Sequence, residues 1–198
     1  MTRAPIHDLH ASNLLTYGSL ASAVVAIAFA HAGSRSGAGA CLALAAILDT
    51  FDGRFARRFT RSPRQSRLGG ELDSLVDAAV FGVAPVVLVT LLSGGAHGGA
   101  ALARWLACFL YVLAALTRLA FYNVQEDDSV FVGLPTPAAG LLWSTYLLRE
   151  TPTWVATLLL VIIGAAMIWP FRFPRPRGAG LAAFALWAAA LVVLHVMR

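Results

Sequence analysis

The sequence predicts an all-α, polytopic membrane protein with about six to seven transmembrane helices. Of its 198 residues, 59% are hydrophobic and 13% are charged, and the mean hydropathy is +0.73. A soluble domain carries about a quarter charged residues. Apolar runs long enough to span ~30 Å of hydrocarbon recur along nearly the whole chain. We therefore expect residues 1–198 to form a single integral-membrane domain.

Seven segments are predicted to be spans, in the order 14–32, 38–56, 71–93, 100–122, 134–149, 152–170 and 179–197. The first follows a basic start and could be a cleaved signal peptide, but its apolar run exceeds the usual ~7–15 residues. We interpret it as the first transmembrane helix. The glycine-rich residues 93–100 separate the third and fourth segments as an external turn. The fifth is short and opens with Pro135 and Pro137.

The arginines predict the orientation, because cytoplasmic loops are enriched in basic residues. With a cytoplasmic N-terminus, the cytoplasmic side receives Arg3, Arg54, Arg57, Arg58, Arg61, Arg64, Arg67, Arg118, Arg172, Arg175 and Arg177, and the other side receives Arg35, Arg104, Arg149 and Arg198. The net charge of +5 therefore lies in short loops, where membrane topology and anionic lipid explain it better than nucleic acid does. Cys41 and Cys108 fall inside predicted spans and suggest buried apolar residues.

Four aspartates lie where the second and third predicted helices meet the cytoplasmic boundary. Asp49 and Asp52 are three residues apart, and Asp73 and Asp77 are four apart, so each pair shares a helix face. A hairpin joined by the 54–68 loop can bring all four carboxylates together. Such a cluster is mutually repulsive without a positive partner. The alternative is a solvated ionic face in which the aspartates pair with the loop arginines.

The ligand type favours a hard divalent cation. Carboxylate oxygens suit Mg²⁺, Mn²⁺ or Ca²⁺, whereas zinc prefers nitrogen and sulfur. The five histidines are scattered and none lies in the cluster. Two divalent ions bridged by shared carboxylates would clamp phosphoryl oxygens during a displacement.

The stretch "DTFDGRFAR…GGELDSLVD" resembles the signature of the CDP-alcohol phosphotransferases, D-x2-D-G-x2-A-R followed by G-x3-D-x3-D. The resemblance implies a catalytic bundle of that family, with a core over about 13–174 and an additional C-terminal helix over about 179–197. The spacer Arg58–Leu68 has eleven residues where the family pattern usually has eight. The extra residues fall in a loop, where insertions are tolerated.

The resemblance also implies roles for individual residues. Asp49, Asp52 and Asp73 would ligate two divalent cations, Mg²⁺ or Mn²⁺, with Asp77 near the second ion and acting as the catalytic base. Residues expected on the CDP and phosphate side are Asn13, Thr16, Asp52, Gly53, Ala56, Arg57 and Gly69. Arg118 and Asn123 would hold the acceptor or a lipid phosphate.

Some of these residues also have ordinary structural interpretations. Asn13 would cap the first helix and Thr16 would bond its own backbone. Gly53 would end the second helix as a C-cap glycine. Arg118 and Asn123 would be interfacial anchors.

Further stretches, among them "RLAFYNV", "FVGLPTPAAG" and "FRFP", are most similar to bacterial phosphatidylserine synthases. That resemblance implies transfer of a phosphatidyl group from CDP-diacylglycerol to L-serine with release of CMP, by a homodimer in the bacterial inner membrane with a cytoplasmic active site. Phe121 and Val80 depart from that pattern, which leaves glycerol 3-phosphate, an inositol phosphate or another alcohol as alternative acceptors. A divalent-cation transporter is the less favoured alternative, because transporter sites lie near the membrane midplane.

Overall fold

The protein is a bundle of helices, described here from a computed structural model that covers residues 4, 8–94, 97–125, 130–174 and 178–198. Its helices are α1 (Leu14–His31), α2 (Arg35–Ala56), α3 (Pro63–Asp77), α4 (Ala84–Leu92), α5 (Gly98–Val124), α6 (Thr136–Leu147), α7 (Thr153–Ile168) and α8 (Ala179–Val196). Each of the seven predicted segments contains a helix, so the all-α fold class is confirmed. Arg3, Arg175 and Arg177 lie outside the described residues.

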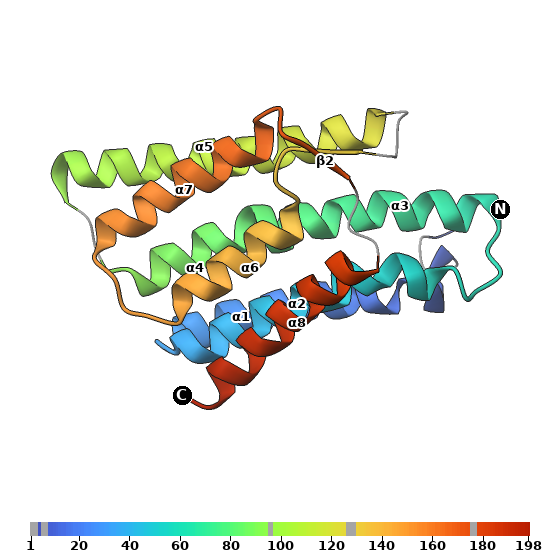
Figure 1. The fold of residues 1–198 in the computed structure, drawn as a ribbon, viewed down its shortest axis with the longest axis horizontal. Coiled ribbons are helices and arrows are strands. Elements are labelled where there is room, and N and C mark those ends of the chain that lie inside the picture. The colour runs from blue at the N-terminus through green and yellow to red at the C-terminus, as the bar shows by residue number, and fades with distance from the viewer. Residues whose placement is uncertain (1–3, 5–7, 95–96, 126–129, 175–177) are drawn as a thin grey trace.

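The bundle is built around α2 (Figure 1). Helix α1 packs along α2, and α6 and α8 contact other parts of α2, while α5 and α7 form a second pair. Alanines line much of the α2 surface that these neighbours cover, and Leu42 of α2 is fully buried. Small side chains allow helices to approach closely in a membrane, where packing rather than hydrophobic burial drives association.

The third helix begins earlier than expected. We predicted a span from residue 71, preceded by a 54–68 loop, but α3 starts at Pro63 and the connection from α2 is correspondingly short. Ser62 and Gln65 form a capping box, and Pro63 occupies the first turn, where its missing N–H costs nothing. The Ser-Pro-x-Gln pattern is a helix start signal, and it lies before the apolar run on which the predicted start was based.

The same helix widens in the middle. A π-helical segment, Ala78–Val83, joins α3 to α4 and begins directly after Asp77. The buried Tyr111 hydroxyl donates a 2.8 Å hydrogen bond to the Phe81 backbone oxygen. Short π segments occur frequently at functional sites, and this one adjoins the predicted catalytic aspartate.

A short two-stranded sheet joins the segment before α6 to the segment after α7, which are about forty residues apart in the sequence. Strand β1 (Val130–Val132) pairs antiparallel with β2 (Arg172–Pro174). Beyond the pair, the Gly133 amide donates to the Phe171 oxygen, and the Leu134 amide donates to the Ala166 oxygen. These bonds fix the segment that leads into α6.

The helix lengths agree with an integral membrane protein. The candidate spans, by length and composition, are Ala11–His31, Pro63–Leu92, Gly98–Val124 and Ala179–Val196. Helix α2 has 22 residues and is as long, but it carries charges at both ends. Helix α6 has only 12 residues, or about 18 Å. It is largely buried by its neighbours, so the predicted 134–149 span is a short interior helix.

Candidate functional site

The four predicted aspartates come together between the C-terminal halves of α2 and α3. One oxygen from each of Asp49, Asp52 and Asp73 lies within 4.8 Å of the others. Asp77 joins them through Asp49, because the two carboxyl groups are within hydrogen-bonding reach of each other. The spacings of three and four residues therefore place all four side chains on facing surfaces of one hairpin, as the sequence predicted.

The geometry suits a divalent cation. The Asp77 Oδ1 atom is buried and accepts no hydrogen bond from a described residue. An unpaired buried carboxylate oxygen is costly, and three more carboxylates beside it raise that cost by like-charge repulsion. None of the four aspartates forms an ion pair with a loop arginine within the described part of the chain, so the structure does not show the solvated ionic face. The donor set is all oxygen, which Mg²⁺ and Mn²⁺ prefer.

A cavity of about 200 Å³, called here the smaller cavity, opens on one side of the aspartates. Its described lining residues are Ser12, Asn13, Thr16, Asp52, Gly53, Ala56, Arg57, Arg61, Ser66, Gly69, Gly70 and Asp73. This set contains every residue predicted on the CDP and phosphate side. It combines hydroxyl, amide and guanidinium donors with small residues that leave room for a ligand.

Three of the ordinary structural interpretations are not what the structure shows. Asn13 precedes α1, but its side chain makes no capping bond and its Oδ1 accepts from the Ser12 hydroxyl at 3.2 Å. Thr16 donates a 3.0 Å hydrogen bond to Asp52 Oδ2 rather than to its own helix. Gly53 lies inside α2, which continues to Ala56.

A cavity of about 720 Å³, called here the larger cavity, opens on the other side. Asp52, Gly53, Arg57 and Asp73 line both cavities and form their shared wall. The larger cavity also contains Asp49, Asp77, Arg118 and Asn123, and it has an apolar side that includes Leu134, Leu181 and Phe184. A mixed polar and apolar lining suits a lipid with a charged headgroup.

The two residues expected to hold the acceptor differ in their surroundings. Arg118 is 6% exposed, its Nε has no partner among the described residues, and its guanidinium stacks 5.7 Å from the Tyr122 ring. Asn123 is exposed, and its Oδ1 accepts a 3.0 Å hydrogen bond from Ser74. Arg118 is therefore more than an interfacial anchor, because an anchor would place its charge in water.

The sequence analysis missed two residues that bear on the site. Thr136, 1% exposed, donates a 3.0 Å hydrogen bond to Asp77 Oδ2. Arg61, which had been counted only as a basic loop residue, lines the smaller cavity. The signal for Thr136 was its place between two prolines in "LPTP", which marks a rigid helix start.

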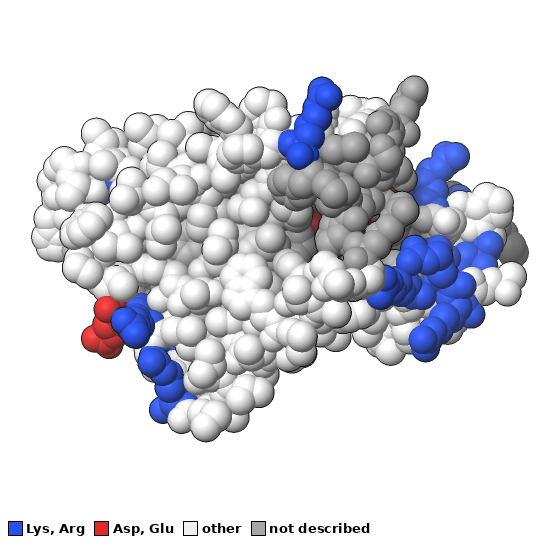
Figure 2. Space-filling model, in the orientation of Figure 1, with Lys and Arg blue, Asp and Glu red and all other residues white. Residues whose placement is uncertain are grey.

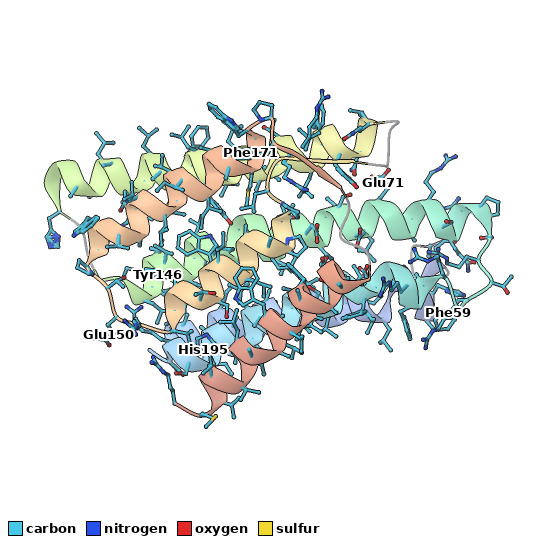
Figure 3. All side chains as sticks on the ribbon, in the orientation of Figure 1. Phe59, Glu71, Tyr146, Glu150, Phe171 and His195 are labelled. Atoms are coloured by element: carbon cyan, nitrogen blue, oxygen red, sulfur yellow. The ribbon has the colours of Figure 1, made fainter. Side chains whose placement is uncertain are left out.

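Arginine side chains gather over the end of the molecule where α2 meets α3 (Figure 2). The described arginines of this stretch are Arg54, Arg57, Arg58, Arg61, Arg64 and Arg67. The acidic cluster thus lies beside a strongly basic end of the bundle. Figure 3 shows Phe59 at this same end and His195 far from it, on α8.

The fold and the site define a class: an integral membrane protein with an acidic, cation-suited hairpin between two ligand-sized cavities. The chain belongs to the CDP-alcohol phosphatidyltransferase family, whose model matches residues 9–196. Enzymes of this family generally depend on divalent cations.

Three relatives illustrate the similarity. The chain is 39% identical to the CDP-diacylglycerol–serine O-phosphatidyltransferase of Mycobacterium tuberculosis over 137 residues, which cover 64% of this chain and 45% of that protein. It is 32% identical to the enzyme of the same name from Helicobacter pylori over 185 residues, 86% of this chain and 75% of that protein. It is 29% identical to the archaetidylserine synthase of Methanothermobacter thermautotrophicus over 173 residues, which cover 85% of this chain and 71% of that protein. The chain spans about half the length of the mycobacterial relatives it matches.

Proposed function

We propose that this protein transfers a phosphatidyl group from CDP-diacylglycerol to the hydroxyl of L-serine, releasing CMP and forming phosphatidylserine. The observation that carries the proposal is the shared wall of two cavities, made by Asp52, Gly53, Arg57 and Asp73. A nucleotide in the smaller cavity and an alcohol in the larger one would meet at that wall. All three relatives described above carry serine in their names.

The smaller cavity would take the cytidine diphosphate part of the donor. Arg57 offers a planar fork that matches phosphate oxygens bidentately. Gly53 has no side chain between the α2 backbone and the cavity, and a Cβ added there would lie 3.7 Å from the Arg57 guanidinium. That space is available to a phosphate group. Asn13 and Thr16 supply an amide and a hydroxyl from α1 and its start for the cytidine.

The larger cavity would take serine and the diacylglycerol part. Arg118 is a buried cation near Asp77, and a single guanidinium fork matches a single carboxylate such as that of serine. Leu134, Leu181 and Phe184 provide the apolar side for acyl chains. Phe121 and Val80, the two departures from the serine-enzyme pattern, line neither cavity. They therefore give no reason to expect another acceptor.

The chemistry is a substitution at the lipid-linked phosphorus. The serine oxygen forms a bond to phosphorus, the bond from phosphorus to the CMP oxygen breaks, and Asp77 takes the serine hydroxyl proton. Asp49, Asp52 and Asp73, with Asp77 beside them, would hold two divalent ions, Mg²⁺ or Mn²⁺. When bound, these ions supply positive charge for the phosphoryl oxygens and acidify a nearby hydroxyl. A hydroxyl acidified in this way would need only a weak base, such as the Asp77 carboxylate.

The site would face the cytoplasm of a bacterial inner membrane. The arginine-rich α2–α3 end supports this orientation, since basic residues favour the cytoplasmic side. The homodimer implied by the family resemblance is a separate proposal, and the mass of the purified protein in detergent tests it. These features do not bear on the reaction itself.

The decisive experiment measures CMP release by purified protein with CDP-diacylglycerol and Mg²⁺ or Mn²⁺. L-serine, glycerol 3-phosphate and inositol phosphate are supplied separately, and Asp77→Asn is the control. The proposal is supported if CMP is released with serine alone and if Asp77→Asn no longer releases it. Release with another alcohol keeps the phosphatidyl transfer but rejects serine as the acceptor. No release with any acceptor, from protein that still binds divalent ions, would favour the transport alternative.

A further inference from the structure

The connection between α2 and α3 supplies an arginine to the smaller cavity. This connection belongs to the eleven-residue spacer Arg58–Leu68, which is three residues longer than the family pattern. Arg58 and Arg61 both lie in it, yet their environments differ. Arg58 is exposed and lines neither cavity, whereas Arg61 is half-buried and lines the smaller one.

The chain on both sides of Arg61 is fixed. The Phe59 ring makes edge contacts with His10 and Phe55, at centroid distances of 5.8 and 5.1 Å. Ser62 caps α3 directly after Arg61. Arg61 therefore belongs to an anchored connection rather than to a loose surface loop.

A second tie joins the start of α3 to the N-terminal segment. Arg64 Nε donates to Asp8 Oδ2 at 3.1 Å, and the Asp8 side chain is only 5% exposed. Exposed ion pairs contribute little, but a pair with one buried partner holds a defined geometry. The segment before α1 is thus held to the start of α3, and both contribute to the wall of the smaller cavity, through Ser12, Asn13 and Ser66.

The Arg61 guanidinium lies where three parts of the chain meet. A Cβ added to Gly69 would be 3.4 Å from Arg61 Nη1 and 3.1 Å from Asn13 Oδ1. No ion pair joins Arg61 to any residue that the structure describes. A guanidinium fork on a cavity wall without a carboxylate partner is suited to an anionic oxygen.

We propose that Arg61 is a further phosphate-binding residue, which together with Arg57 holds the diphosphate of a cytidine nucleotide in the smaller cavity. The longer connection gives this chain a second guanidinium where the family signature provides one. The inference rests on the proposed function only in taking a CDP-linked lipid as the physiological ligand. Binding of the free nucleotide tests it independently of the reaction.

The experiment titrates CDP and cytidine into the full-length protein in detergent with Mg²⁺, by calorimetry. Arg61→Ala is compared with Arg58→Ala, which removes the same charge from the same connection without touching a cavity. We expect Arg61→Ala to weaken CDP binding about tenfold or more, the size of a lost charge-assisted hydrogen bond. Cytidine, which has no phosphate, should bind Arg61→Ala and wild type equally. Arg61→Lys should fall between, because it keeps the charge but loses the fork.

Activity provides a second measurement. Arg61→Ala should raise the KM for CDP-diacylglycerol and leave kcat nearly unchanged, with thermal unfolding confirming that the variant is folded. The proposal is overturned if Arg61→Ala binds CDP as Arg58→Ala does, or if it loses CDP and cytidine equally. A wild-type protein that binds CDP but transfers to no alcohol would reject the proposed reaction while the CDP comparison still decides the role of Arg61.

Discussion

Thr136, the first residue of α6, donates a 3.0 Å hydrogen bond to Oδ2 of Asp77, which lies 59 residues earlier in the chain. The bond fixes one oxygen of the carboxylate and leaves Oδ1 without a donor among the described residues. Thr136 is itself fully enclosed, so its hydroxyl has little freedom to turn elsewhere. The orientation of the proposed base is therefore set by a helix that contributes no acid to the cluster.

Replacing Thr136 with valine should slow phosphatidyl transfer about tenfold, because a hydrogen bond to a charged group contributes about 1.5–3 kcal/mol. The shape is conserved, so the loss falls on kcat rather than on the KM for CDP-diacylglycerol. Thr136→Ser keeps the hydroxyl and should restore most of the rate. Steady-state kinetics of the three proteins check this, and equal rates for the valine and serine variants would contradict it.

Neutralising one carboxylate should stabilise the protein without cations and abolish its response to them. In chelator, Asp73→Asn should unfold at a temperature a few degrees above wild type, because like-charge repulsion in the cluster is relieved. Added Mg²⁺ or Mn²⁺ should then raise the unfolding temperature of wild type only, since a ligand stabilises the state that binds it.

The matched control for this change is Glu71→Gln, on the same helix. Glu71 is exposed and lines neither cavity. It should keep the wild-type unfolding temperature in chelator and the full response to cations. A response that persists in Asp73→Asn would remove this residue from the cation site.

Gly133 is required by both conformation and space. Its φ is +72°, and a Cβ there would lie 2.0 Å from the Met167 backbone oxygen. Gly133→Ala should therefore cost about 3 kcal/mol or more, since a backbone oxygen cannot move aside. Gly94 has a similar φ of +69° and nothing within 4 Å of an added Cβ. Gly94→Ala should cost only the conformational part, about 1–2 kcal/mol.

Denaturation of the two alanine variants in detergent measures the difference. The larger loss at Gly133 should be accompanied by lower activity, because Gly133 and Leu134 tie the start of α6 to the end of α7. Equal losses at the two glycines would show that the close approach to Met167 is relieved at no cost.

His195 connects α8 to two other helices at the end of the bundle away from the aspartates (Figure 3). Its Nε2 lies 3.0 Å from the Ser144 backbone oxygen, and the Ser144 hydroxyl donates to the Gly39 oxygen at 2.8 Å. A Cβ on Gly39 would lie 2.2 Å from the imidazole. Gly39→Ala and His195→Ala should each destabilise the protein, the first by overpacking and the second by a lost bond and a cavity.

The double variant tests this contact directly. Removing the imidazole makes room for the new methyl group, so the two losses should be less than additive, with a coupling of about 1 kcal/mol or more. Thermal or denaturant unfolding of the four proteins provides the cycle. Simple additivity would mean that His195 and Gly39 are not in contact.

The sequence predicted the parts of this protein that depend on local pattern. The spacing of Asp49, Asp52, Asp73 and Asp77 predicted one acidic cluster, and the structure brings the four together. Apolar runs located the helices of the described part of the chain, but they misplaced the start of α3, because its first turns after the Ser62 capping box are polar. Thr136 could not be paired with Asp77 in advance, since no local rule fixes where a helix so much later in the chain will begin.

The roles of Asn13, Gly69, Arg118 and the other proposed ligand contacts stay predictions. The structure places these residues on the walls of the two cavities. Arg58 and Arg61 cannot be told apart by sequence pattern, because both are arginines of the same basic connection. Only the folded structure shows that Arg61 lines the smaller cavity and that Arg58 does not.

The four aspartates of the site all come from one hairpin, between Asp49 and Asp77. Arg118, Thr136 and the α8 residues that line the larger cavity follow later in the chain. A protein synthesised from its N-terminus delivers the four carboxylates to the membrane before the helices that will enclose them exist. During insertion the hairpin must therefore keep its acids hydrated at the water boundary. In the proposed orientation its own arginines would help, because basic residues favour the cytoplasmic side, from which the chain is inserted. The enclosed cavities are completed last, around a cluster that has already taken its position.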